Sequence, residues 1–96
     1  MNKDDEIIII RWWKSLKWNY SRYISSTTGK EYILLEKRIV YEDARDSYTK
    51  RIKIDVKNKT YNCYEDFMCG CERSITLTFK ENEVLSATIR FVNEQS

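Results

Sequence analysis

The first quarter of the chain carries its apolar side chains at intervals of three and four residues. At 100° per residue, residues 5–26 then form a helix with one apolar sector and one polar sector. The apolar sector holds Ile9, Trp12, Trp13, Leu16, Tyr20, Tyr23 and Ile24. Asp4 or Asp5 can cap this helix, and the polar run that ends at Gly29 can stop it. The four successive isoleucines at positions 7–10 favour a strand, so a short strand over residues 6–13 is the alternative.

After Gly29 the apolar positions alternate with polar ones, which is the pattern of strands with one buried face. The alternation predicts strands at residues 31–41, 48–57, 60–67, 74–80 and 85–91. The segments EDARDS, Asn58-Lys59, MCGCE and KENE are predicted to connect them. We therefore expect an α+β fold, in which one N-terminal amphipathic helix packs on an antiparallel meander sheet of about four to five strands. Residues 1–96 are expected to form a single globular domain.

The composition supports a folded domain and limits its location. Hydrophobic residues make up 42% of the chain, which is too many for a disordered protein. Proline is absent and glycine occurs only twice, so the sequence holds no proline-rich segment and no glycine-rich phosphate loop. The acids of residues 4–6 stand where a signal peptide would be positive, and no apolar stretch approaches the length of a membrane span. We expect a cytoplasmic protein without membrane contact, in the host cytoplasm if a phage encodes it.

The sequence contains no histidine. This excludes Ser-His-Asp and Cys-His catalysis, and it excludes metal sites built on histidine. Cys63, Cys69 and Cys71 are the candidate metal ligands, but a zinc site needs a fourth ligand and usually paired C-x2-C spacing. Asp66, Glu72 or a second subunit would have to complete such a site. We expect no metal and no cofactor, with Cys63 as a small core side chain and the other two as reduced thiols.

An enzyme hypothesis rests on the sequence Asp55-Val56-Lys57. Metal-dependent nucleases place an acid-x-lysine motif of this form on a strand, with a second acid upstream, here Asp43 or Asp46. Two carboxylates could hold Mg²⁺, and the lysine could stabilise developing charge. Because 33% of the residues are charged, such a triplet arises easily by chance, and a metal-dependent nuclease is a minor alternative.

Residues 11–23, RWWKSLKWNYSRY, interleave cationic and aromatic side chains. In the helical interpretation Trp12 and Trp13 belong to the core, whereas Trp18 falls in the polar arc. An exposed tryptophan ringed by cations would mark a binding surface; the alternative is that a loop or the C-terminal tail covers Trp18. The candidate partner-binding or nucleic-acid-binding residues are Arg11, Lys14, Lys17, Trp18 and Arg22.

Positive charge is concentrated in the same part of the chain. Residues 11–38 carry a net charge of +5, whereas residues 1–10 carry −2 and residues 39–96 carry −1. A local basic face attracts nucleic acid or an acidic protein surface. The pI of about 8.4 lies below that of most dedicated nucleic-acid-binding domains, which favours a protein partner.

These features lead to a hypothesis of function. We predict a non-enzymatic macromolecule-binding protein, specifically a small inhibitor of the phage or mobile-element type (anti-CRISPR, anti-defence or immunity-like). It would dock on a protein target and occlude it. The abundance of Ile, Asn, Lys and Tyr, all encoded by A/T-rich codons, is consistent with a low-GC bacterium or its mobile elements. The alternative is nucleic-acid binding through the basic, Trp-bearing helix face, and edge strands would also permit a homodimer by strand addition.

Overall fold

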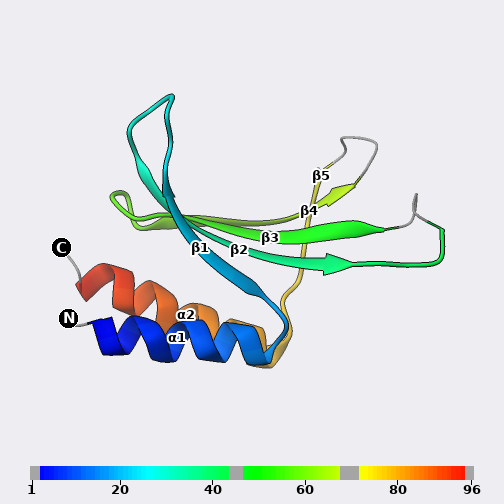
Figure 1. Ribbon diagram of the computed structural model, residues 1–96, viewed down its shortest axis with the longest axis horizontal. Helices are drawn as coiled ribbons and strands as arrows, with labels where there is room; N and C mark the ends of the chain where they lie inside the picture. Colours follow the sequence, from blue (N-terminus) through cyan, green and yellow to red (C-terminus); the bar gives the residue numbers. More distant parts are fainter. Residues whose placement is uncertain (1–2, 44–46, 68–71, 95–96) are drawn as a thin grey trace.

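Two helices lie side by side beneath one face of an antiparallel sheet in the computed structural model, which describes residues 3–43, 47–67 and 72–94 (Figure 1). The elements are α1 (Lys3–Ser15), β1 (Asn19–Ile24), β2 (Glu31–Ile39), β3 (Tyr48–Asp55), β4 (Thr60–Phe67), β5 (Glu72–Ser74) and α2 (Phe79–Glu94). The strands follow one another across the sheet in chain order, so the sheet is a meander. The predicted α+β class, with an N-terminal helix packed on an antiparallel meander sheet, is confirmed.

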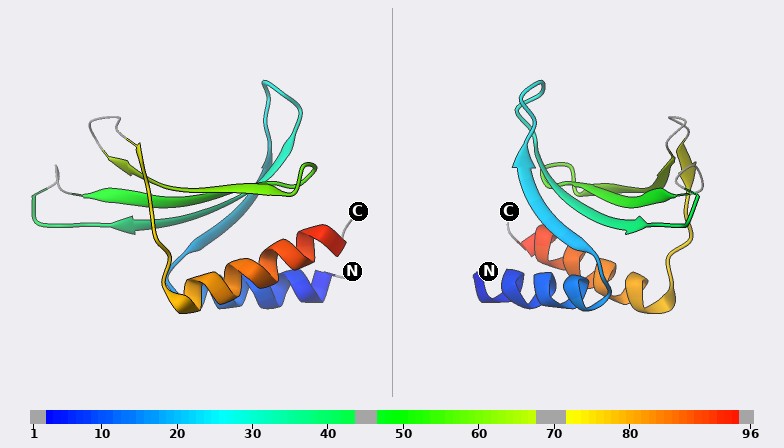
Figure 2. Two further views of the ribbon diagram at one scale, coloured as in Figure 1. Left: turned by 180° about the vertical axis from the view of Figure 1, so that it is seen from behind. Right: turned by 45° about the vertical axis from the view of Figure 1, so that its right-hand side comes forward.

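The pairing of β2 with β3 places apolar side chains together on the face of the sheet that the helices cover. Ile33 lies opposite Ile54, and Leu35 lies opposite Ile52. All four side chains are fully buried. Because successive side chains of a strand point to opposite faces, their neighbours point to the other face, which no helix of the described chain covers (Figure 2). The alternation in the sequence thus indicated a sheet with one buried face.

The predicted helix over residues 5–26 is correct only for its first half. α1 ends at Ser15, and Asn19–Ile24 forms β1. The alternative of a short strand over residues 6–13 is wrong, because these residues lie inside α1. Burial of Ile9 and Trp13 stabilises the helix, since packing of an amphipathic face outweighs the strand preference of isoleucine.

A C-cap explains why α1 ends where it does. The N–H of Trp18 donates to the Trp13 carbonyl at 3.0 Å, and the N–H of Lys17 donates to the Lys14 carbonyl at 3.0 Å. Lys17 adopts a positive φ of 70°. These are the two hydrogen bonds and the left-handed residue of a Schellman motif, with lysine in the position that usually holds glycine. The cap rotates Trp18 out of the polar arc that an unbroken helix would have given it.

The strand predicted at residues 85–91 is wrong, and of the one predicted at residues 74–80 only Ser74 is in a strand, β5. α2 occupies this part of the chain and begins with a capping box. The N–H of Glu81 donates to Thr78 Oγ1 at 3.2 Å, and the N–H of Thr78 donates to Glu81 Oε1 at 2.9 Å. The segment KENE, predicted as a turn, is therefore in the first turns of the helix. The buried positions recur at helical spacing and are Glu81, Val84, Leu85, Thr88, Phe91 and Val92.

Trp13 joins the two helices in the core. Its side chain is fully buried, and its indole N–H donates to Thr88 Oγ1 at 2.9 Å. The Thr88 hydroxyl in turn donates to the Val84 carbonyl at 2.7 Å. The polar atoms that this contact brings into the core are thus hydrogen-bonded, as buried polar atoms generally are. In the part of the chain that the structure describes, neither helix has the length and apolar character of a membrane span.

Candidate docking site on the helix layer

Trp18, which the sequence placed at the centre of a binding surface, lies in the core. Its side chain is 1% exposed, and its ring meets that of Trp13 edge-on at 5.4 Å between centroids. Its indole N–H donates to Glu81 Oε2 at 2.8 Å. The interpretation of Trp18 as an exposed contact residue is therefore wrong. The alternative, that a loop or the C-terminal tail covers Trp18, is correct in that Trp18 is covered, but the helix α2 supplies a covering contact.

Glu81 is a buried carboxylate with a structural role. Burial raises the pKa of its side chain, but the hydrogen bonds from Thr78 and Trp18 and the charge of Lys50 outweigh this, so the pKa lies below its ordinary value. The carboxylate thus stays charged at neutral pH. It holds the start of α2 and the indole of Trp18 in one place.

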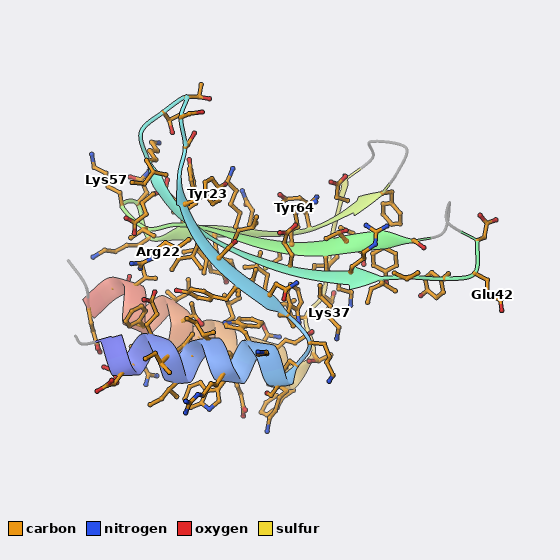
Figure 3. The ribbon with its side chains drawn as sticks, viewed as in Figure 1. Arg22, Tyr23, Lys37, Glu42, Lys57 and Tyr64 are labelled. Carbon is orange, nitrogen blue, oxygen red and sulfur yellow. The ribbon has the colours of Figure 1, made fainter. Side chains whose placement is uncertain are left out.

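Arg22 belongs to β1 and contributes to the contact between β1 and α1 (Figure 3). Its guanidinium lies 3.6 Å from Glu6 Oε2 and 3.4 Å from Glu31 Oε1. The Tyr20 hydroxyl donates to the same Glu6 oxygen at 2.7 Å, and burial together with this hydrogen bond raises the pKa of Tyr20. Arg22 therefore does not share a helix face with the other predicted contact residues.

The remaining three predicted cations stay together near the end of α1. Arg11 and Lys14 are exposed on the helix, and Lys17 is exposed in its cap. They lack the aromatic partner that the nucleic-acid hypothesis assigned to them, because Trp18 is buried. With Trp18 in the core, this ring is lost for base stacking, whereas the attraction of the cations for phosphate remains.

Asp55, from the predicted nuclease motif, closes the turn between β3 and β4. Its carboxylate accepts hydrogen bonds from the Asn58 backbone N–H at 3.0 Å and from Asn58 Nδ2 at 2.8 Å. The backbone hydrogen bond lowers the pKa of Asp55. Asp43 is exposed in the loop after β2, and Asp46 lies outside the described residues. Asp55 thus has the role of a turn residue.

The cysteines supply no metal site within the described residues. Cys63 is half-buried on β4, and burial raises the pKa of its thiol, which makes it less reactive. Cys69 and Cys71 lie outside the described residues. Within residues 3–43, 47–67 and 72–94, no group of three or more His, Cys, Asp or Glu side chains could hold a metal ion.

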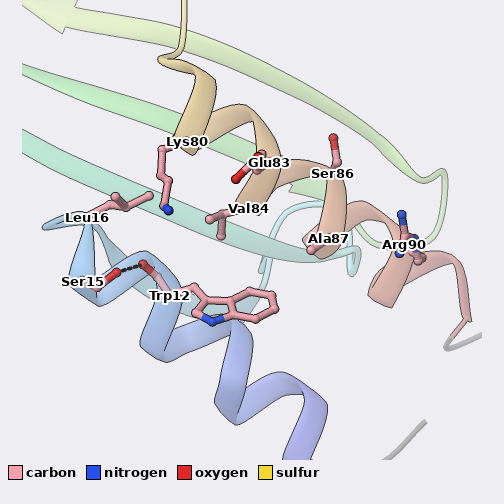
Figure 4. Close-up of a pocket in the computed structure, with 9 residues that line it drawn as sticks. All are labelled: Trp12, Ser15, Leu16, Lys80, Glu83, Val84, Ser86, Ala87 and Arg90. Carbon is pink, nitrogen blue, oxygen red and sulfur yellow. Dashed lines mark hydrogen bonds between the residues drawn. The ribbon is translucent and has the colours of Figure 1, made fainter.

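A groove runs along the outer side of the seam between α1 and α2 (Figure 4). It consists of a hollow of about 560 Å³ and a second of about 310 Å³. Trp12, Ala87 and Arg90 line both hollows, so the two are adjacent. The other lining residues of the larger hollow are Ser15, Leu16, Lys80, Glu83, Val84 and Ser86.

Trp12 is the principal apolar side chain of this groove. The sequence placed it in the core, but it is 47% exposed. The reason is its neighbour: Trp12 and Trp13 are adjacent, so their side chains point 100° apart, and only Trp13 faces the sheet. Ile8, one turn before Trp12, is 43% exposed and lines the smaller hollow. The adjacent tryptophans were the signal in the sequence for an apolar residue outside the core.

The groove has a different charge at each end. Asp5 and Glu94 line the smaller hollow, next to the N-terminus of α1. Lys80 and Glu83 line the larger hollow, next to Ser15. Arg90 lies between them, since it lines both hollows. An apolar middle with charged rims is the usual composition of a protein-binding surface.

The uncovered face of the sheet is less suited to docking, because its side chains contact one another. The rings of Tyr23 and Tyr32 are stacked, with 5.6 Å between their centroids. The guanidinium of Arg51 pairs with the carboxylates of both Glu36 and Asp66. These groups would have to exchange existing contacts for new ones on binding.

Comparison with known proteins adds no relative: no family model, no curated protein and no solved structure matches this chain.

Proposed function

We propose that this protein acts by binding protein through the groove between α1 and α2, without catalysing a reaction. The observation that carries the proposal is Trp12, a half-exposed tryptophan in the middle of the groove. Tryptophan and arginine are the residues enriched at the energetic centre of protein interfaces, and Arg90 lies beside Trp12 in both hollows.

The exposed part of Trp12 is large enough to matter energetically. Half of a tryptophan side chain amounts to about 100 Å² of apolar surface. Removing it from water would contribute about 2.5 kcal/mol to binding, which is the size of a hot-spot residue. Exposed isoleucines on the same helix, among them Ile8, would add to this contribution.

The mode of action that we propose is occlusion. A target protein that binds the groove would have part of its own surface covered. A small phage-type inhibitor in the cytoplasm would act on its target in this way. Three exposed cations lie on α1 and in its C-cap, namely Arg11, Lys14 and Lys17. Their charge would favour an acidic target surface. Without Trp18, the nucleic-acid alternative rests on these three cations and on the exposed ring of Trp12.

Affinity capture tests the proposal. The wild-type protein and Trp12→Ala are immobilised separately, incubated with a nuclease-treated lysate of a low-GC bacterium, and the retained proteins are identified by mass spectrometry. Tyr61→Ala is the matched control, since Tyr61 on β4 is a comparably exposed aromatic residue at 49%. We expect at least one protein that wild type and Tyr61→Ala retain and Trp12→Ala does not. Identical retention by all three would overturn the proposal.

The captured protein then tests occlusion. Its own activity is measured with increasing amounts of wild type or of Trp12→Ala. Inhibition by the wild type alone is the expected result. A target that keeps its full activity when saturated would show that binding does not occlude a functional surface.

A further inference from the structure

The exposed side of α1 has a repeating pattern next to the groove. Asp4, Ile7, Arg11 and Lys14 follow one another at steps of three and four residues, so they lie along one side of the helix. Ile7 is 45% exposed, and the three charged residues are also exposed. This row, which we call the α1 flank, is acidic at the start of the helix and basic towards its end.

The groove beside the flank is acidic at the same end. Asp5 and Glu94 line this end, whereas Lys80 and Glu83 at the other end balance each other in charge. Asp5 and Ser15, which line opposite ends, are separated by ten residues of helix, or about 15 Å. The face that combines flank and groove thus changes from acidic to basic over about 15 Å, with Ile8 and Trp12 in the middle.

A helix suits this groove better than an extended peptide does. The groove is lined by the side chains of two helices, whose backbone groups are already hydrogen-bonded within the helices. An extended segment placed there would leave its own N–H and C=O groups without partners, whereas a helix satisfies them internally. The occupant should therefore be an amphipathic helix, with opposite charges at its two ends.

We infer that the occupant is α1 of a second copy of this chain, so that the protein forms a homodimer through its helix layer. The inference rests on the proposed function, because it names what fills the same groove when no target protein is bound; a target protein would displace the second copy. α1 is itself a helix with exposed Ile8 and Trp12 and with opposite charges at its ends. Two copies related by a two-fold axis place their α1 helices antiparallel, with Ile8 of each near Trp12 of the other.

The antiparallel arrangement also pairs opposite charges. In two antiparallel helices the same side of each helix meets across the interface, so Asp4 of one copy lies on the same side as Arg11 of the other. A parallel arrangement would bring like charges together. An interface of this length is at the small end for specific complexes, so we expect a dimer that dissociates on dilution.

Sedimentation equilibrium and light scattering test the dimer, over concentrations from roughly 1 µM to 1 mM. The wild-type mass should rise with concentration from 11.6 kDa towards twice that value. Trp12→Ala should raise the dissociation constant at least about tenfold, because the substitution removes a hot-spot side chain from each copy. Tyr61→Ala should leave it unchanged. A wild-type dimer that Trp12→Ala does not weaken would overturn the inference.

Charge reversal provides a second test that does not depend on Trp12. Asp4→Lys and Arg11→Glu should each raise the dissociation constant about threefold or more, because each opposes like charges across the interface. The double variant restores opposite charges and should return within about twofold of the wild type. Circular dichroism verifies that each variant is folded. A double variant weaker than both single variants would overturn the antiparallel arrangement.

The two proposals fail in different ways. A protein that stays monomeric at every concentration, yet captures another protein in a Trp12-dependent manner, overturns the dimer and keeps the proposed function. A protein that stays monomeric and captures nothing through Trp12 overturns both.

Discussion

At the scale of single residues, three tryptophans within seven positions have three different environments. The indole N–H of Trp13 donates to Thr88, and that of Trp18 donates to Glu81. Both rings are buried, whereas Trp12 is half-exposed in the groove. The three residues have the same chemical nature, so their different roles come from their positions. The direction of each side chain around α1 separates Trp12 from Trp13, and the C-cap of α1 turns Trp18 into the core.

Substitution should separate these roles. Trp18→Ala should lower the free energy of unfolding by about 3–5 kcal/mol, because it removes a buried aromatic side chain. Trp12→Ala should lower it by only about 1 kcal/mol, because half of that side chain is already in water. Urea denaturation followed by circular dichroism measures both. Equal losses for the two variants would mean that Trp12 is also part of the core.

Glu81 should make the stability depend on acid pH. Its pKa is lower in the folded protein than its ordinary value, so its contribution is present above the ordinary carboxyl range. That contribution is lost as the pH falls through the folded pKa. We expect Glu81→Gln to be less stable than the wild type by about 1 kcal/mol at pH 7, with the two converging in acid.

Denaturation at a series of pH values verifies this expectation. The lowered pKa of Asp55 should leave some acid dependence in Glu81→Gln. A variant whose stability falls with acid as steeply as that of the wild type would show that Glu81 is not the group responsible.

At the scale of the elements, the cap of α1 holds a lysine in a backbone conformation that glycine adopts more easily. Lys17 has a φ of 70°, and a side chain in this region is unfavourable by about 1–2 kcal/mol. Lys17→Gly should therefore raise the free energy of unfolding by about 0.5–1 kcal/mol, after allowing for the greater entropy of unfolded glycine.

Lys17→Ala is the control for this prediction, since it removes the charge and keeps the Cβ atom. Thermal and urea unfolding should show a gain for glycine and none for alanine. An equal gain for both variants would assign the effect to the lysine charge.

The elements that the sequence predicted well are those with one consistent period. The alternation of residues 48–57 and 60–67 corresponds to β3 and β4, because a strand keeps its phase until a turn. In α2, Leu85 and Phe91 fit both a strand and a helix, and only the burial of Val84 and Thr88 separates the two. The spacing of Thr78 and Glu81, a capping box, was the local signal for the helix.

The candidate site was harder to predict than the fold. A helical projection of residues 5–26 assumes an unbroken phase, and the cap at Lys17 breaks it. Trp18 was therefore placed outside, although it is buried. Trp12 was placed inside for a different reason: it was assigned to the same apolar sector as Trp13, although adjacent side chains of a helix point 100° apart. The groove also needs α2, and an N-terminal sequence pattern contains no information about a helix that packs from the other end of the chain.

At the scale of the whole molecule, α2 completes a core that the preceding segments cannot complete. A chain that stops after Thr78 would lack the acceptors of both buried indoles, Glu81 and Thr88. It would also lack the apolar side chains that α2 buries. We expect this truncated chain to show no cooperative thermal transition in circular dichroism, whereas a chain that stops after Glu94 should keep one. A cooperative transition in the shorter chain would contradict the prediction.

The two indole hydrogen bonds have a consequence for synthesis of the protein. They join residues separated by 75 and 63 positions, so each tryptophan emerges from the ribosome long before its acceptor. At typical translation rates of about 5–20 residues per second, the interval lasts several seconds. The meander can pair its strands in that time, but the indole N–H groups of Trp13 and Trp18 lack their acceptors until α2 follows. The nascent chain therefore passes through a stage with exposed tryptophans, and this is when chaperones would bind it.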